Sequence, residues 1–201
     1  MRRFRAFLAI AVALITGILV GIRLFIPWAL GAELAFLQAS SYASSYGADL
    51  QVLRFGDRGV IPTVTMRGLS LNSSMMGNLR CDEVAVRPLI MESVLHWSPT
   101  AQLTVSRGVL ALPGGVDHRL DGAMTCLLSS GTILLSDVAL TGDLSAQGRV
   151  SISPERGKIL EADMVISVPE DMDGAMTVLS QLFPMKRSPD GTWALSREGG
   201  K

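Results

Sequence analysis

The chain has 201 residues and a formal net charge of zero, with 18 basic and 18 acidic side chains. Four of the basic residues lie in the first 32 positions, which hold no acid, so the remainder carries 14 basic against 18 acidic residues. A mildly acidic body without a basic stripe argues against a nucleic-acid partner. Two cysteines and two histidines, widely scattered, are too few for a typical zinc cluster. We therefore expect one domain with no cofactor.

The N-terminal segment predicts a membrane anchor. Residues 6–22 form an uncharged apolar run of 17 residues, close to the roughly 20 that a spanning helix needs. The apolar character continues to residue 28, which gives an anchor over 6–28 behind a cytoplasmic N-terminus at 1–5. The flanking residues suit the two membrane boundaries: Arg2, Arg3, Arg5, Arg23 and Trp28. This arrangement predicts a single-pass protein whose C-terminal body lies outside the cytoplasm.

A cleaved signal peptide is the alternative interpretation of the same segment. Ala29-Leu30-Gly31 offers small residues in the spacing of a cleavage site. Arg23 and Pro27, which lie between the apolar run and that site, favour the uncleaved anchor.

A connecting helix is predicted over 29–49, because leucines recur at helical spacing up to the stop signal at Gly47. A β domain is then predicted over 50–201. Its alternating runs and turn signals have the spacing of an antiparallel meander. The run at 89–97 breaks the alternation and favours a short helix. The expected strands are 50–55, 60–71, 79–88, 102–112, 115–128, 132–140, 143–153 and 158–168, with a final short strand within 188–195.

The alternation is clearest in residues 137–153, which we interpret as two strands joined at Gly142-Asp143. One parity is apolar and rich in small residues, so another group could approach the sheet closely. Its larger members form a candidate face for a lipid or a partner protein: Val138, Leu140, Leu144, Ala146, Val150 and Ile152. The simplest occupant is a helix of the same chain. Residues 170–183 carry an apolar stripe at helical spacing and acids in the first turn, as such a helix would.

The sequence contains no recognisable catalytic or metal-binding motif. His96 and His118 lie 22 positions apart without a ligand spacing, so we expect both at the surface or at strand edges. Cys81 and Cys126 fall in predicted strands on apolar parities. Outside the cytoplasm they could form a disulfide, or each could be a small buried hydrophobic residue.

Several stretches resemble one family of secretion proteins. The likeness lies in "GADLQVLRFGDRGVIPTVTMRGLSL" (47–71), "VAVRPLIMESVL" (84–95), "LTVSRGVLALPGG" (103–115) and the tail around "DGTWALSREG" (190–199). These resemble the type II secretion system protein N (GspN) family, which is similar in turn to the AsmA-like group of envelope proteins.

The resemblance implies a mainly β fold, with an N-terminal transmembrane helix, a curved antiparallel sheet and one or two short covering helices. It implies a non-enzymatic accessory component of type II secretion in the inner membrane, with other secretion-system or envelope proteins as partners. A second implication, from the AsmA-like group, is a periplasmic lipid-binding or lipid-transfer protein. The lipopolysaccharide-transport component LptC shares the plan of one anchor and a periplasmic β fold.

Overall fold

The computed structural model describes residue 17 and residues 28–45, 47–58, 63–73, 77–111, 116–129, 131–153 and 158–197. The predicted anchor at 6–28 lies outside the described residues, apart from Gly17 and Trp28, and so do Arg2, Arg3, Arg5 and Arg23. Among the described residues, no helix combines the length and the apolar character needed to cross a bilayer.

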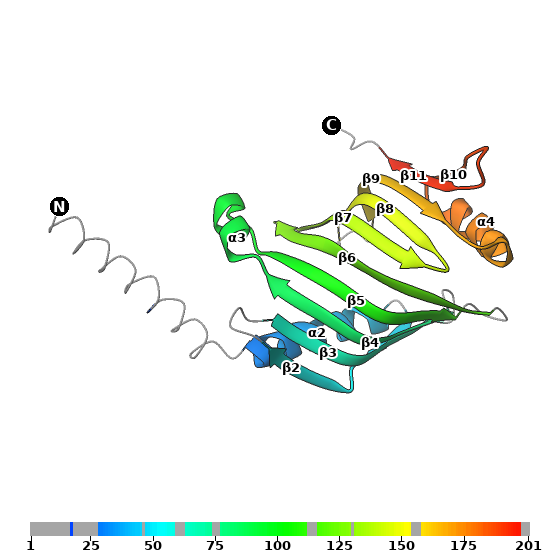
Figure 1. Cartoon of the computed structure of the whole chain (residues 1–201). Coiled ribbons are helices and arrows are strands. Elements are labelled where there is room, and N and C mark those ends of the chain that lie inside the picture. The colour runs from blue at the N-terminus through cyan, green and yellow to red at the C-terminus, as the bar shows by residue number, and fades with distance from the viewer. Residues whose placement is uncertain are drawn as a thin grey trace, which may run out of the picture.

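The described chain is mainly antiparallel sheet with a few short helices, as predicted (Figure 1). The helices are α2 (Trp28–Ser45), α3 (Ile90–His96), the 3₁₀ turn η1 (Glu170–Met172) and α4 (Asp173–Leu182). The strands of the N-terminal half are β1 (Ala48–Gln51), β2 (Arg54–Arg58), β3 (Thr63–Ser73), β4 (Gly77–Pro88) and β5 (Thr100–Ala111). Those of the C-terminal half are β6 (Asp117–Ser129), β7 (Thr132–Gly142), β8 (Ser145–Ser153), β9 (Lys158–Ser167), β10 (Met185–Arg187) and β11 (Trp193–Arg197).

The strands form one open, curved sheet in the order β1-β3-β4-β5-β6-β7-β8-β9-β11-β10, and β2 also pairs with β3. From β3 to β9, consecutive strands pair antiparallel with each other, so this part is the predicted meander. The hairpin between β7 and β8 turns just after Gly142, as its sequence indicated.

β-Bulges add twist to the middle of the sheet. Two residues of β5 oppose one of β6 at Arg107, which has a φ of 52°. The Arg107 backbone N–H donates to Oδ1 of Asp121 at 2.5 Å, which holds the bulge in place. A second bulge lies in β7 at Asp137, with a φ of 50°. The strong right-handed twist that such bulges produce accounts for the curvature of the sheet.

Cross-strand pairing gathers the apolar side chains on one side of the sheet, here called the apolar face. Val64, Val86 and Leu103 follow one another across β3, β4 and β5. Leu135, Val150 and Ala162 do the same across β7, β8 and β9. The opposite face carries polar side chains and cross-strand ion pairs such as Arg149–Glu161. Each register thus keeps one parity of side chains on each side of the sheet, so the apolar face stays on one side from β3 to β9.

Helix α2 covers the apolar face at the β1–β2 edge. The rings of Phe36 and Phe55 meet edge-on with centroids 5.5 Å apart, and Phe55 pairs with Met66 on the apolar face. The Ser40 hydroxyl donates to the Leu50 carbonyl at 3.1 Å. These contacts run the helix antiparallel to the β1–β2 segment, so α2 starts near the end of the sheet formed by Arg58.

The boundaries differ from the sequence expectations at three places. The expected strand over 50–55 is two strands, β1 and β2, separated at Val52-Leu53. Gly68, inside the expected strand over 60–71, takes a φ of 62°, a conformation that alternation does not indicate, and the β3–β4 register stays unbroken there. The three-residue strand β10 was not expected, since it is too short to show alternation.

Candidate functional site

The six residues of the predicted lipid or partner face do share one side of β7 and β8. Val138, Leu144, Ala146 and Val150 are buried, whereas Leu140 and Ile152 are half-buried. Among them, Leu144 packs with Met172, and Val150 packs with Ala162 and Leu195. Their binding role stays a prediction, and the more open part of the same face lies elsewhere.

One end of the apolar face is closed by η1 and α4. Met172 of η1 packs with Leu120 and Leu144, and all three are buried. His118, only 5% exposed, has its Nε2 3.2 Å from Oδ2 of Asp171. The expectation of a surface or strand-edge histidine at this position is therefore wrong, because η1 folds back over β6.

Asp173 ties α4 to the last strands. Its Oδ1 accepts a hydrogen bond from Nε1 of the buried Trp193 at 3.3 Å, and its Oδ2 accepts one from Arg187 at 2.5 Å. The predicted helix over 170–183 is thus present as η1 and α4, and covers one end of the apolar face rather than its length. The acids of its first turn hold it to the sheet, a role that the helical pattern alone did not reveal.

The other end of the apolar face is open and forms a groove of about 700 Å³ beside α3. Its floor consists of Val86, Leu103, Cys126 and Leu128 from the sheet, and its wall comes from α3. Pockets of about 300–1,000 Å³ with mainly apolar linings are typical of small-molecule sites. The groove could therefore accept an apolar chain.

Helix α3 stands at the mouth of the groove with its apolar side chains in solvent. The exposed fractions are 84% for Met91, 63% for Val94, 75% for Leu95 and 92% for Trp97. The base of the helix is nevertheless fixed: the Ser93 hydroxyl donates to the Leu89 carbonyl at 2.8 Å and accepts from the Thr100 N–H at 2.9 Å. These hydrogen bonds hold α3 in place while its apolar side chains and Trp97, here called the tip, project into solvent.

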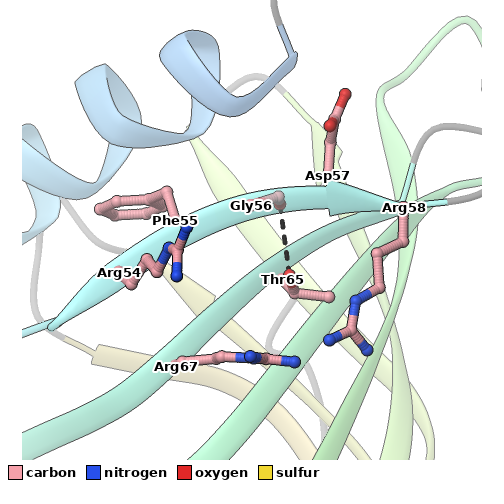
Figure 2. Close-up of a pocket in the computed structure, with 7 residues that line it drawn as sticks. All are labelled: Arg54, Phe55, Gly56, Asp57, Arg58, Thr65 and Arg67. Atoms are coloured by element: carbon pink, nitrogen blue, oxygen red, sulfur yellow. Dashed lines mark hydrogen bonds between the residues drawn. The ribbon is translucent and has the colours of Figure 1, made fainter.

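A shallow arginine-rich pocket of about 230 Å³ lies on the polar face at the β2–β3 edge (Figure 2). Arg54, Arg58 and Arg67 point to the same side of the two strands, and Phe55 points away toward α2. Glu83 lies 3.6 Å from Arg58 and 3.1 Å from Arg67, so it offsets part of their charge. The pocket retains positive character and suits an anionic group.

The two cysteines are free thiols, so the structure does not contain the disulfide that was one of the two alternatives. Cys81 pairs with Gly108 and Cys126 with Ala101, so the cysteines lie two strands apart and seven β5 positions apart. At about 4.8 Å per strand and 3.3 Å per residue, their Cα atoms lie more than 20 Å apart. A disulfide needs Cα atoms within about 7 Å.

Metal-ligating groups do not converge in the described part of the chain: no three His, Cys, Asp or Glu residues are arranged to hold an ion. Burial raises the pKa of both thiols, and the Asp82 carboxylate adds to the effect at Cys81. Thiols with raised pKa values are poor nucleophiles near neutral pH, because the thiolate is the reactive form. The chemistry that the site offers is apolar contact and charge.

Comparison with known proteins supports the resemblance noted in the sequence. Residues 5–197 match the family described as type II secretion system protein GspN-like, Synergistales. No curated protein and no solved structure matches the chain. The match spans nearly the whole sequence, including the open sheet, both covering helices and the α3 tip. The chain therefore belongs to the type II secretion system GspN-like family of Synergistales.

Proposed function

We propose that the protein is a non-enzymatic accessory component of type II secretion, held in the inner membrane by one N-terminal helix with its β domain in the periplasm. The family match over residues 5–197 carries this proposal. Three arginines before the uncharged run at 6–22 support the orientation, since positive flanks stay cytoplasmic. An open sheet with no recognisable catalytic motif suits a protein that binds partners.

Deletion of the gene tests the secretion role. Substrates of type II secretion should accumulate in the periplasm of the deletion strain. Its outer membrane should remain resistant to detergent. The full-length gene should restore export. Normal export in the deletion strain would contradict the proposal.

The orientation has its own test. A reporter enzyme active only in the periplasm, fused after Lys201, should be active, and the mature chain should keep its N-terminal segment. A mature mass beginning near Ala32 would instead establish a cleaved signal peptide, and activity of a cytoplasmic reporter alone would reverse the topology.

A second candidate function, lipid binding or transfer, is favoured by the groove beside α3. Its floor is apolar, its mouth is open, and its volume is about 700 Å³, within the range of ligand pockets. An acyl chain lying there would cover Leu103, Cys126 and Leu128. On this function the deletion strain should become detergent-sensitive, with altered envelope lipids and normal export, which is the reverse of the first expectation.

A further inference from the structure

We infer that α3 and Trp97 form a membrane-contacting tip, which enters the interfacial layer of the bilayer that holds the N-terminal anchor. The inference rests on the proposed membrane anchoring. It assigns a partner surface to a short helix that neither the family match nor the sheet topology explains.

The first support is the surface that α3 presents. Met91, Val94 and Leu95 lie on one side of the helix, since residues three and four apart are neighbours on a helix surface. Trp97 follows in the left-handed conformation, with a φ of 50° and 92% of its surface exposed. A water-exposed set of large apolar side chains that ends in a tryptophan is typical of a membrane-interface contact.

The second support is the position of the tip. In the sheet, α3 joins β4 to β5 at the end where Arg58 closes β2. The contacts Phe36–Phe55 and Ser40–Leu50 direct the start of α2, at Trp28, toward that same end. Figure 1 shows α3 projecting beyond β4 and β5 at this end. The predicted anchor is continuous with Trp28, so the anchor and the tip meet the bilayer from one end of the domain.

The third support is the distribution of charge. Arg58, Arg87 and Lys158 lie at the α3 end of the sheet, where the nearby carboxylates are Asp57, Glu92 and Glu83, which Arg58 shares with Arg67. The opposite end carries Asp117, Asp143, Glu170 and Asp171 at the strand ends and on η1, and the Arg187 side chain at this end is paired with Asp173. Anionic headgroups attract the first set and repel the second. This asymmetry orients the α3 end, rather than the opposite end, toward an anionic membrane surface.

The groove beside α3 lies next to the proposed membrane contact and could receive an acyl chain from the bilayer. Ile90, Val94 and Trp97 line the groove as well as the tip, so a tip seated in the interface brings the groove mouth to the acyl layer. A second copy of the chain docked on α3 would instead close the groove off.

A depth-dependent quenching experiment on the full chain tests the contact. Leu95→Cys and Val116→Cys are made in a Cys81→Ala, Cys126→Ala background and labelled with an environment-sensitive fluorophore. Val116 is the matched control, because it is 66% exposed against 75% for Leu95 but lies next to β6 at the far end of the sheet. The proteins are inserted into phosphatidylethanolamine–phosphatidylglycerol vesicles, with and without spin-labelled lipid. We expect several-fold quenching at Leu95 and none at Val116.

Equal fluorescence with and without spin label at Leu95, in protein that resists carbonate extraction, would overturn the inference and leave the anchor standing. Release of the chain by carbonate would overturn the anchor and the inference with it. Should the cysteine-free background fail to fold, a benzophenone amino acid at positions 95 and 116 replaces the fluorophore. Crosslinks from position 95 to lipid support the inference, and crosslinks to a second copy or another protein overturn it.

Discussion

The imidazole of His118 and the carboxylate of Asp171 join residues 53 positions apart in the chain, with Nε2 and Oδ2 separated by 3.2 Å. His118 belongs to β6 and Asp171 to η1. The pair therefore holds η1 against the sheet at the closed end of the apolar face. Met172, the next residue, then packs between Leu120 and Leu144.

Asp171→Ala should destabilise the domain by about 1–3 kcal/mol, because it leaves the Nε2 of a buried histidine without its partner. The loss should fall near the lower limit, since the Asp171 side chain is 46% exposed and solvent can partly replace it. Urea unfolding of the detergent-solubilised protein measures it. Asp117→Ala, on the neighbouring exposed position, should change little, and equal effects at both sites would show that the pair contributes nothing specific.

Gly148→Ala should be among the most damaging single substitutions in the sheet. Gly148 has a φ of 133°, and an added Cβ would collide with the carbonyl oxygen of Asp163 on the paired strand. Strand β8 would have to separate from β9. Gly174→Ala is the control: nothing lies within 4 Å of its Cβ and it sits in α4, so the change should stabilise by up to about 1 kcal/mol. Thermal melts that shift in the same direction for both would contradict the assigned β8–β9 register.

Ala146→Trp should overpack the apolar face and lower stability by about 1–3 kcal/mol. Ala146 is only 4% exposed and is flanked across the sheet by Leu140 and Ile166. Ser145→Trp, on the other parity, should cost less. A large fall in melting temperature at position 146 would make this part of the face a packed core, whereas a folded but inactive Ala146→Trp protein would assign it a ligand.

The rate at which the Cys126 thiol reacts should report whether the groove beside α3 is occupied, because Cys126 lines that groove. Because burial raises its thiol pKa above the usual 9.0, the thiolate fraction at neutral pH is smaller than for a free cysteine. Maleimide labelling of Cys126 should therefore be slow at pH 7. Its rate should still be increasing when the pH passes 9.0, the usual pKa of a cysteine thiol. Phospholipid added to the solubilised protein should slow labelling at Cys126, with Cys81, 3% exposed, slow throughout. Unchanged labelling with lipid would place lipid outside the groove.

The sequence located most of the sheet because local alternation records which side of a strand faces water. The hairpin at 137–153 is the clearest case: parity alone separated Val138 and Leu144 from Asp137 and Asp143. The short helix at 89–97 was also visible, because it breaks the period of two. These features depend on neighbours in the chain, and the meander keeps most contacts between such neighbours.

Features set by distant parts of the chain were not visible. The apolar parities of Cys81 and Cys126 left a disulfide open as one of two alternatives, but the β4–β5–β6 register separates the two residues, and register follows from turns and bulges such as Arg107. His118 looked like a surface histidine because nothing near it in sequence indicates that η1 returns to cover it. The exposed set on α3 was equally hidden, since apolar residues in a short helix ordinarily predict burial.

The meander has a consequence for how such a protein can change length. From β3 to β8, every strand pairs with the strand before it and the strand after it in the chain, and the described strands form an open sheet. Adding or removing one hairpin would alter the width of the sheet by about 10 Å without disturbing the pairing on either side. The two edges of the sheet, one covered by α2 and the other contacted by α4, would stay the same. The domain is thus extensible by whole hairpins, as a solenoid is extensible by whole repeats.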